Sequence, residues 1–125
     1  MPKPGYTGLK RVYKATGYSW QGLKAAWRHE SAFRQECTLA LIMTPLAFII
    51  ANDLIQVVLM LSVLAIVLIT ELLNSVVESV VDRVSDDPHE LAGRAKDQGS
   101  AAVFVSLALV VIVWGSVILH NFVLS

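Results

Sequence analysis

The sequence is poor in charge, in cysteine and in the glycine motifs that hold nucleotides. Only 16% of its 125 residues are charged, and ten Lys and Arg balance ten Asp and Glu. Without a net basic charge or a basic run interleaved with aromatics, no nucleic-acid partner is expected. The single cysteine excludes an internal disulfide. Neither GxxxxGKS/T nor GxGxxG occurs, so any nucleotide must be held without those loops.

Apolar residues, in contrast, are abundant. They make up 55% of the chain, and the mean hydropathy is +0.61, which is typical of a membrane protein. No charge occurs from Leu54 to Thr70 or from Ala101 to Leu119, and a spanning helix needs about 17 to 25 such residues. A third run, Cys37 to Ala51, is short, so it must recruit Ser31 to Phe33, let the flanking Arg34 and Glu36 reach outward, or sit shallow in the membrane.

The positions of the basic residues predict the topology. Seven of the ten Lys and Arg precede residue 37, and the other three lie between the second and third apolar runs. By the positive-inside bias, residues 1–36 and 83–100 are cytoplasmic, so two spans separate them and the C-terminus lies outside. We therefore expect an all-α membrane protein with a single membrane domain, 1–125. Its N-terminal segment is 1–30, its three spans are 31–51, 54–82 and 100–120, and its cytoplasmic loop is 83–99.

The N-terminal segment has the pattern of an amphipathic helix. Its basic residues, among them Lys10, Lys14 and Lys24, lie opposite an apolar stripe. A basic back and a tryptophan-containing stripe are typical of a helix that lies in the headgroup plane of an anionic leaflet. Packing on a soluble domain is disfavoured because too little chain remains to build one, and Gly17 and Gly22 are potential breaks. The stripe comprises Leu9, Val12, Tyr13, Thr16, Trp20, Leu23 and Trp27.

Polar residues form one stripe at the end of the second span, in the stretch ELLNSVVESVVD. Glu71, Asn74, Glu78 and Asp82 stand at i, i+3, i+7 and i+11, within about 80° around a helix. If about 20 residues cross the hydrocarbon from Leu54, Glu71 lies at its cytoplasmic boundary.

Glu71 is the strongest candidate for chemistry in this stripe. A carboxylate at such a boundary is destabilised in its charged form and suited to accept a proton. The alternative is that Glu71 and Asn74 only fasten helices by hydrogen bonds. That alternative suits Asn74 better than Glu71, since a fastener need not ionise.

The cytoplasmic segments add groups suited to metal and phosphate. Carboxylates such as Glu30, Glu78 and Asp97 are ligands that Mg²⁺ accepts, although scattered acids are usually only solvated. Asp87, with Glu90 three residues later, predicts a helix start, and the position of His89 favours a helix-start role over a catalytic one. Small residues from Gly99 to Ala102 permit close helix approach.

Four stretches together resemble the prokaryotic diacylglycerol kinase family of integral inner-membrane enzymes. They are GYSWQGLKAAW (17–27), ESAFRQE (30–36), ELLNSVVESVVDR (71–83) and HELAGRAKDQGSAAV (89–103). The resemblance implies a homotrimer of three-span subunits, each with a surface helix. It also implies transfer of the ATP γ-phosphoryl group to diacylglycerol with Mg²⁺, giving phosphatidic acid, in the bacterial inner (plasma) membrane with a periplasmic C-terminus.

The resemblance also implies site residues. Glu71 matches the catalytic base, Asn74 stands beside it in the motif, and Glu30 and Glu78 match the metal carboxylates. Pro88 replaces an aromatic usual in the family's nucleotide loop. The residues matching ATP-binding positions are Arg11, Tyr18, Glu30, Glu78, His89, Lys96 and Asp97. Those matching lipid-binding positions are Arg11, Ser19, Trp20, Gln35, Glu71, Ser100 and Trp114.

Two other functions fit parts of the pattern. A related kinase acting on undecaprenol resembles the chain around ELxN and KD, but the GYSW, FRQE and GSAAV stretches favour diacylglycerol. A non-enzymatic small oligomeric membrane protein, such as a proton conductor, would need ionisable groups deeper in the membrane. Neither charge-free run supplies any.

Overall fold

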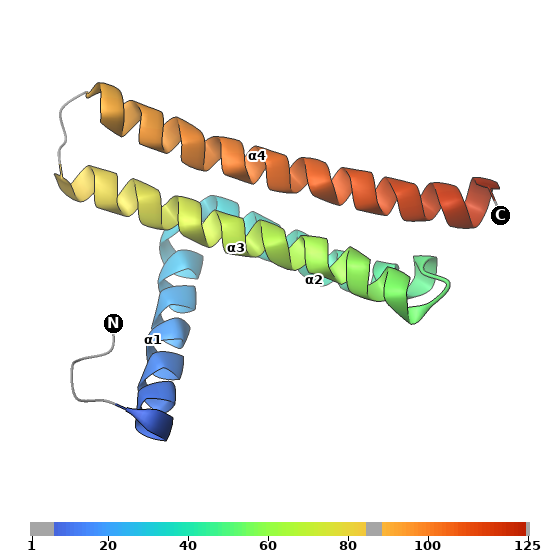
Figure 1. The fold of residues 1–125 in the computed structure, drawn as a ribbon, viewed down its shortest axis with the longest axis horizontal. Helices are drawn as coiled ribbons and strands as arrows, with labels where there is room; N and C mark the ends of the chain where they lie inside the picture. The colour runs from blue at the N-terminus through green and yellow to red at the C-terminus, as the bar shows by residue number, and fades with distance from the viewer. Residues whose placement is uncertain (1–6, 85–88, 125) are drawn as a thin grey trace.

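The structure, a computed structural model, describes residues 7–84 and 89–124, and over these residues every regular element is helical (Figure 1). This confirms the all-α class. Three of the helices are long and apolar enough to cross a membrane, as predicted. The elements are α1 (Gly8–His29), α2 (Ser31–Ile50), α3 (Leu54–Val84), α4 (Glu90–Leu119) and a terminal π-helical turn, η1 (His120–Leu124).

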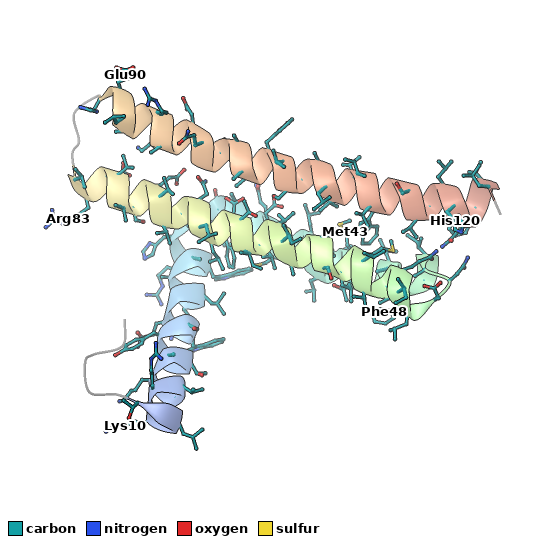
Figure 2. All side chains as sticks on the ribbon, in the orientation of Figure 1. Lys10, Met43, Phe48, Arg83, Glu90 and His120 are labelled. Carbon is teal, nitrogen blue, oxygen red and sulfur yellow. The ribbon has the colours of Figure 1, made fainter. Side chains whose placement is uncertain are left out.

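The three long helices pack side by side, and α1 leaves them at a steep angle (Figure 1). α3 is central, because it packs on both α4 and α2. Figure 2 shows Arg83 and Glu90 together at one end of the α3–α4 pair, and His120 and Phe48 at the opposite end. Arg83, which follows the second apolar run, therefore lies at the same end of the bundle as the start of α4.

The short first apolar run is completed as the sequence predicted. α2 begins at Ser31 and ends at Ile50, a length of 20 residues. At about 1.5 Å per residue the helix is about 30 Å long, which matches the hydrocarbon thickness of a typical bilayer. The recruited residues Ser31 to Glu36 bring Arg34 and Glu36 onto the same helix as the apolar run.

The core lies in the half of the bundle that carries the α2–α3 connection. Ala47 of α2 packs with Met60 and Leu64 of α3 and with Trp114 of α4, all of them buried. The Trp114 indole Nε1 donates a hydrogen bond of 3.1 Å to the Met60 carbonyl. Trp114 thus joins α3 and α4 by both apolar contact and a hydrogen bond.

Two helix starts position residues of interest. Glu30 has an extended backbone between α1 and α2, and its N–H donates to the Ala26 carbonyl. At α4, His89 is the N-cap, and its Nδ1 accepts from the Leu91 N–H at 3.0 Å. The expected helix start at Asp87 is therefore wrong, because the helix begins at Glu90. Asp87 and Pro88 themselves lie outside the described residues.

The N-terminal helix is continuous. α1 runs unbroken through Gly17 and Gly22, so neither glycine interrupts it. The large residues of its apolar stripe, including Leu9, Trp20 and Trp27, are exposed in the single chain. The stripe is therefore open to contact with lipid or with another chain.

Candidate functional site

Glu71 is buried inside the bundle. Its side chain belongs to the eighteenth residue of α3, about 26 Å from the start of that helix. Only 5% of Glu71 is exposed, and it is the one acidic residue that is buried among the described residues. Burying a carboxyl group costs free energy unless a partner or a functional need retains it.

The charged groups that act on Glu71 electrostatically are other acids. The carboxylates that act on it electrostatically belong to Glu36, Glu78 and Glu30, in decreasing order. Within residues 7–84 and 89–124, none of these four acids forms an ion pair. Within the described part of the chain the cluster therefore has no ion-paired cation, although Lys96 acts electrostatically on Glu78, and the cluster is suited to attract a cation.

Asn74 links the stripe to α4. Its amide Nδ2 donates to Glu78 Oε2 at 3.4 Å, while its Oδ1 is buried without a hydrogen-bond partner among the described residues. It lines a groove of about 430 Å³ between α3 and α4, together with Gly99 and Ala102. Of the small residues expected to allow close helix approach, Gly99 does so, because a Cβ atom there would meet Asn74.

An ion pair joins the charged ends of α3 and α4. Lys96 Nζ lies 2.7 Å from Asp82 Oδ1, and the two side chains are 44% and 63% exposed. Both residues lie beyond the charge-free runs of their helices. The hydrogen bond to Asp82 and its negative charge raise the pKa of Lys96, so the ammonium stays charged at neutral pH.

The predicted site residues fall into separate grooves of the single chain. A groove of about 580 Å³ between α1 and α3, the α1–α3 groove, includes Ser19 and Glu30 in its lining, and a groove of about 500 Å³ at the start of α4, the α4 groove, includes His89 and Asp97. Trp20 and Gln35 line two further grooves beside α2. Arg11, Tyr18 and Ser100 line none of these, and all three are exposed or half-buried.

Trp114 is placed apart from the other candidates. Its partner Met60 precedes Glu71 by eleven residues on α3, about 16 Å along the helix. The single chain therefore gives Trp114 a place in the helix core rather than beside the acids.

The donor set near Glu71 has the chemistry of a magnesium site. Within the described part of the chain, no three His, Cys, Asp or Glu side chains converge closely enough to hold a metal by themselves. Mg²⁺ usually takes only one or two carboxylates and completes its shell with water and phosphate oxygens. Glu30 and Glu78, which form no ion pair among the described residues, fit such a site.

Sequence reasoning missed two residues that shape this region. Glu36 was grouped only with the residues flanking a span, although it acts most strongly among the acids on Glu71. Arg34 was treated in the same way, but its Nη1 donates to the carbonyls of Trp27 at 2.7 Å and Arg28 at 3.2 Å. The only signal in the sequence was that both charges interrupt the start of an apolar helix.

Comparison with known proteins identifies the family. The sequence model described as prokaryotic diacylglycerol kinase matches residues 17–118. A protein of Haemophilus influenzae named diacylglycerol kinase is 53% identical over 112 residues, which cover 90% of this chain and 95% of that protein. Proteins of the same name from Escherichia coli K12 and Pseudomonas aeruginosa are 50% and 47% identical, covering 86% and 94% of this chain and 88% and 96% of theirs. The chain therefore belongs to the prokaryotic diacylglycerol kinase family and is a kinase.

Proposed function

We propose that this enzyme transfers the γ-phosphoryl group of ATP to the free hydroxyl of diacylglycerol, with Glu71 as the general base. The observation that carries the proposal is a buried carboxyl on a helix able to span a membrane, on which three other acids act that form no ion pair among the described residues. The names of the relatives support the lipid substrate. Diacylglycerol keeps its acyl chains in the membrane and its hydroxyl at the boundary, the depth expected for Glu71.

The proposed reaction is a single displacement at phosphorus. The hydroxyl oxygen of the lipid forms a bond to the γ-phosphorus as the bond from that phosphorus to the β,γ-bridging oxygen breaks. The proton of the hydroxyl passes to a Glu71 carboxylate oxygen, and ADP leaves with the bond electrons. The products are phosphatidic acid and ADP. Burial of Glu71 excludes water that would compete with the lipid for its proton-accepting oxygen.

We assign the metal of this reaction to Glu30 and Glu78. A kinase needs a divalent cation in general, and we propose Mg²⁺. When bound, it would neutralise phosphate charge and orient the triphosphate. Glu78 is held by the hydrogen bond from Asn74, and Glu30 is held by its position between two helices. The protein's contribution is to fix these two carboxylates beside the base.

The nucleotide and the lipid are proposed to approach Glu71 from opposite sides. Lys96 and Asp97 lie with His89 at the charged end of α4. From there they can contact a triphosphate that arrives from the cytoplasm. Arg11 and Tyr18 are the proposed nucleotide contacts on α1. The proposed lipid contacts, by the family resemblance, are Arg11, Ser19, Trp20, Gln35, Ser100 and Trp114.

We infer a bacterial inner-membrane location with the N-terminus and the 83–99 segment in the cytoplasm. Arg83 and Glu90 share one end of the bundle, opposite His120, which supports a charged cytoplasmic end (Figure 2). The exposed stripe on α1 supports its role as an amphipathic surface helix. A reporter that is active only in the periplasm, fused after residue 125, should be active. A reporter that is active only in the cytoplasm should be inactive there, and its activity would contradict the topology.

We propose a homotrimer with a site shared between subunits, and the separation of the grooves supports the sharing. Within one chain, the α1–α3 groove and the α4 groove are lined by different helices, and the acids near Glu71 form no ion pair among the described residues. A second copy can bring its α4 groove to the acids of the first. Mixing Glu71→Gln subunits with Asp97→Asn subunits should then restore activity that neither variant has alone, whereas absence of restoration would indicate a site within one chain.

A lipid panel tests the activity directly. Purified protein in mixed micelles is incubated with labelled ATP, Mg²⁺ and either diacylglycerol or undecaprenol, and labelled lipid is measured. Diacylglycerol should be phosphorylated far faster. A preference for undecaprenol would reassign the substrate, and no lipid-dependent ATP consumption with either would favour a non-enzymatic oligomer.

A further inference from the structure

The amide of Asn74 occupies a confined position between α3 and α4. Its Oδ1 is buried and has no hydrogen-bond partner within residues 7–84 and 89–124, while its Nδ2 reaches only Glu78. A buried acceptor left without a donor is destabilising. An Asn side chain can usually turn to find a partner, so something must hold this one in place.

Gly99 of α4 faces this amide directly. A Cβ atom built on Gly99 would overlap Asn74 Oδ1, lie 3.3 Å from Asn74 Cγ and lie 3.8 Å from Val77 Cγ1. The same atom built on Gly115, also in α4, would meet nothing within 4 Å. Glycine weakens a helix relative to alanine, so its presence inside α4 calls for a packing reason. At Gly99 that reason is the Asn74 amide.

We infer that Gly99 is a positioning residue that acts through Asn74 on Glu78. The missing side chain leaves space for the amide against the α4 backbone, with Nδ2 directed at Glu78 Oε2. A partner that fixes the orientation of a metal-binding carboxylate contributes to metal affinity. The role of Glu78 in this inference rests on the proposed function. The contact between Gly99 and Asn74 is independent of that function.

A double-mutant cycle tests the contact without any measurement of activity. The denaturant midpoint of the purified protein in micelles is measured for Gly99→Ala, Asn74→Ala and the double variant. Gly99→Ala should lower the midpoint when Asn74 is present and leave it unchanged or higher when Asn74 is alanine. An equal shift in both backgrounds would overturn the inference. If Gly99→Ala alone does not fold, recovery of folding in the double variant supports it, and failure of both overturns it.

The Mg²⁺ requirement tests the action on Glu78. Gly99→Ala should raise the Mg²⁺ concentration for half-maximal activity by about 10- to 100-fold, as loss of an outer-shell partner does. Gly115→Ala is the matched control, with the same change in the same helix but open space around it, and it should not shift the requirement. An unchanged requirement in Gly99→Ala would overturn the action on Glu78. A wild-type protein without lipid kinase activity would reject the proposed function and leave the stability cycle to decide the contact.

Discussion

The two ends of the bundle use their polar residues in opposite ways. At the end with the α2–α3 connection, Asn121 donates to the Ile50 carbonyl and to Gln56 Oε1, each at 2.8 Å, and it accepts from Gln56 Nε2 at 3.1 Å. Gln56 Oε1 also accepts from the Asn52 N–H at 2.8 Å. At the end near Glu71, four acids form no ion pair and Asn74 Oδ1 lacks a donor among the described residues.

This difference indicates that the polar residues at the Asn121 end stabilise the fold, whereas those at the Glu71 end serve the function. Amides that satisfy one another hold helices together and leave nothing for a ligand. Polar groups kept without partners cost stability, and proteins retain such groups where a substrate or ion completes them. Substitutions at the Asn121 end should therefore change stability alone, and substitutions at the Glu71 end should change activity.

The largest effect is expected from Glu71→Gln. Glutamine keeps the size of the side chain and removes the proton-accepting carboxylate, so kcat should fall by about 10²- to 10⁴-fold. The folded state should persist, because a neutral amide is easier to bury than a carboxylate. The measurement is the initial rate with diacylglycerol and saturating ATP, together with the denaturant midpoint.

Asp53→Asn is the matched control for that loss. Asp53 stands at the opposite end of α3, where its Oδ1 accepts from the Gln56 N–H at 2.9 Å. Asparagine caps a helix as well as aspartate does, so both activity and stability should remain near wild type. Near-normal activity in Glu71→Gln would remove the base from the mechanism, whereas equal losses in both variants would point to a general effect of charge removal.

Asn121→Ala should separate stability from activity at the other end. Its loss leaves the Gln56 amide without two of its contacts, which should cost about 0.6 to 2 kcal/mol in the free energy of unfolding. The specific activity of the folded protein should not change, since Gln56 precedes Glu71 by about 22 Å of helix. Asn52→Ala, which retains its backbone N–H bond to Gln56, serves as the control. A loss of activity without a loss of stability would refute the separation of the two ends.

Arg34→Ala should have a smaller effect on activity. The guanidinium fastens the last turn of α1 to α2 by its bonds to the Trp27 and Arg28 carbonyls, and Glu30 lies between the two helices. Loosening this joint displaces Glu30, which should lower kcat by about tenfold. Arg34→Lys, which keeps the charge and one donor direction, should retain more activity. Equal activity in Arg34→Ala and wild type would show that the joint does not position Glu30.

The sequence predicted the fold well because the fold depends on periodicity and on charge sidedness. Both charge-free runs became helices, and the helix of the short run begins at Ser31, so it includes Ser31 to Phe33 as expected. The start of α4 was misjudged because Asp87 and His89 are both able to cap a helix, and the choice between them depends on backbone geometry that no local pattern specifies.

The candidate site was predictable only in part. The stripe from Glu71 to Asp82 follows from helical spacing alone, and the structure confirms that Glu71 is buried. The contact of Gly99 with Asn74, and the bonds of Arg34, depend on which helix packs against which, so they could not be derived from one segment at a time. The separation of His89 and Asp97 from Ser19 and Glu30 likewise became visible only in three dimensions.

The smallest expected effect concerns the Lys96–Asp82 pair, which belongs to the charged end but is satisfied. Because both side chains are substantially exposed, Asp82→Asn should barely change stability. The pKa of Lys96 is raised above its ordinary value by the hydrogen bond and charge of Asp82, so any stability from the pair is present at neutral pH and lost only in strongly alkaline solution.

If Lys96 must leave Asp82 to meet a phosphate, Asp82→Asn should lower the apparent KM for ATP by no more than about fivefold. Glu90→Gln, which breaks the exposed Arg94–Glu90 pair within α4, should leave that KM unchanged. A higher KM in Asp82→Asn would mean that Asp82 orients Lys96 for the nucleotide rather than competing with it.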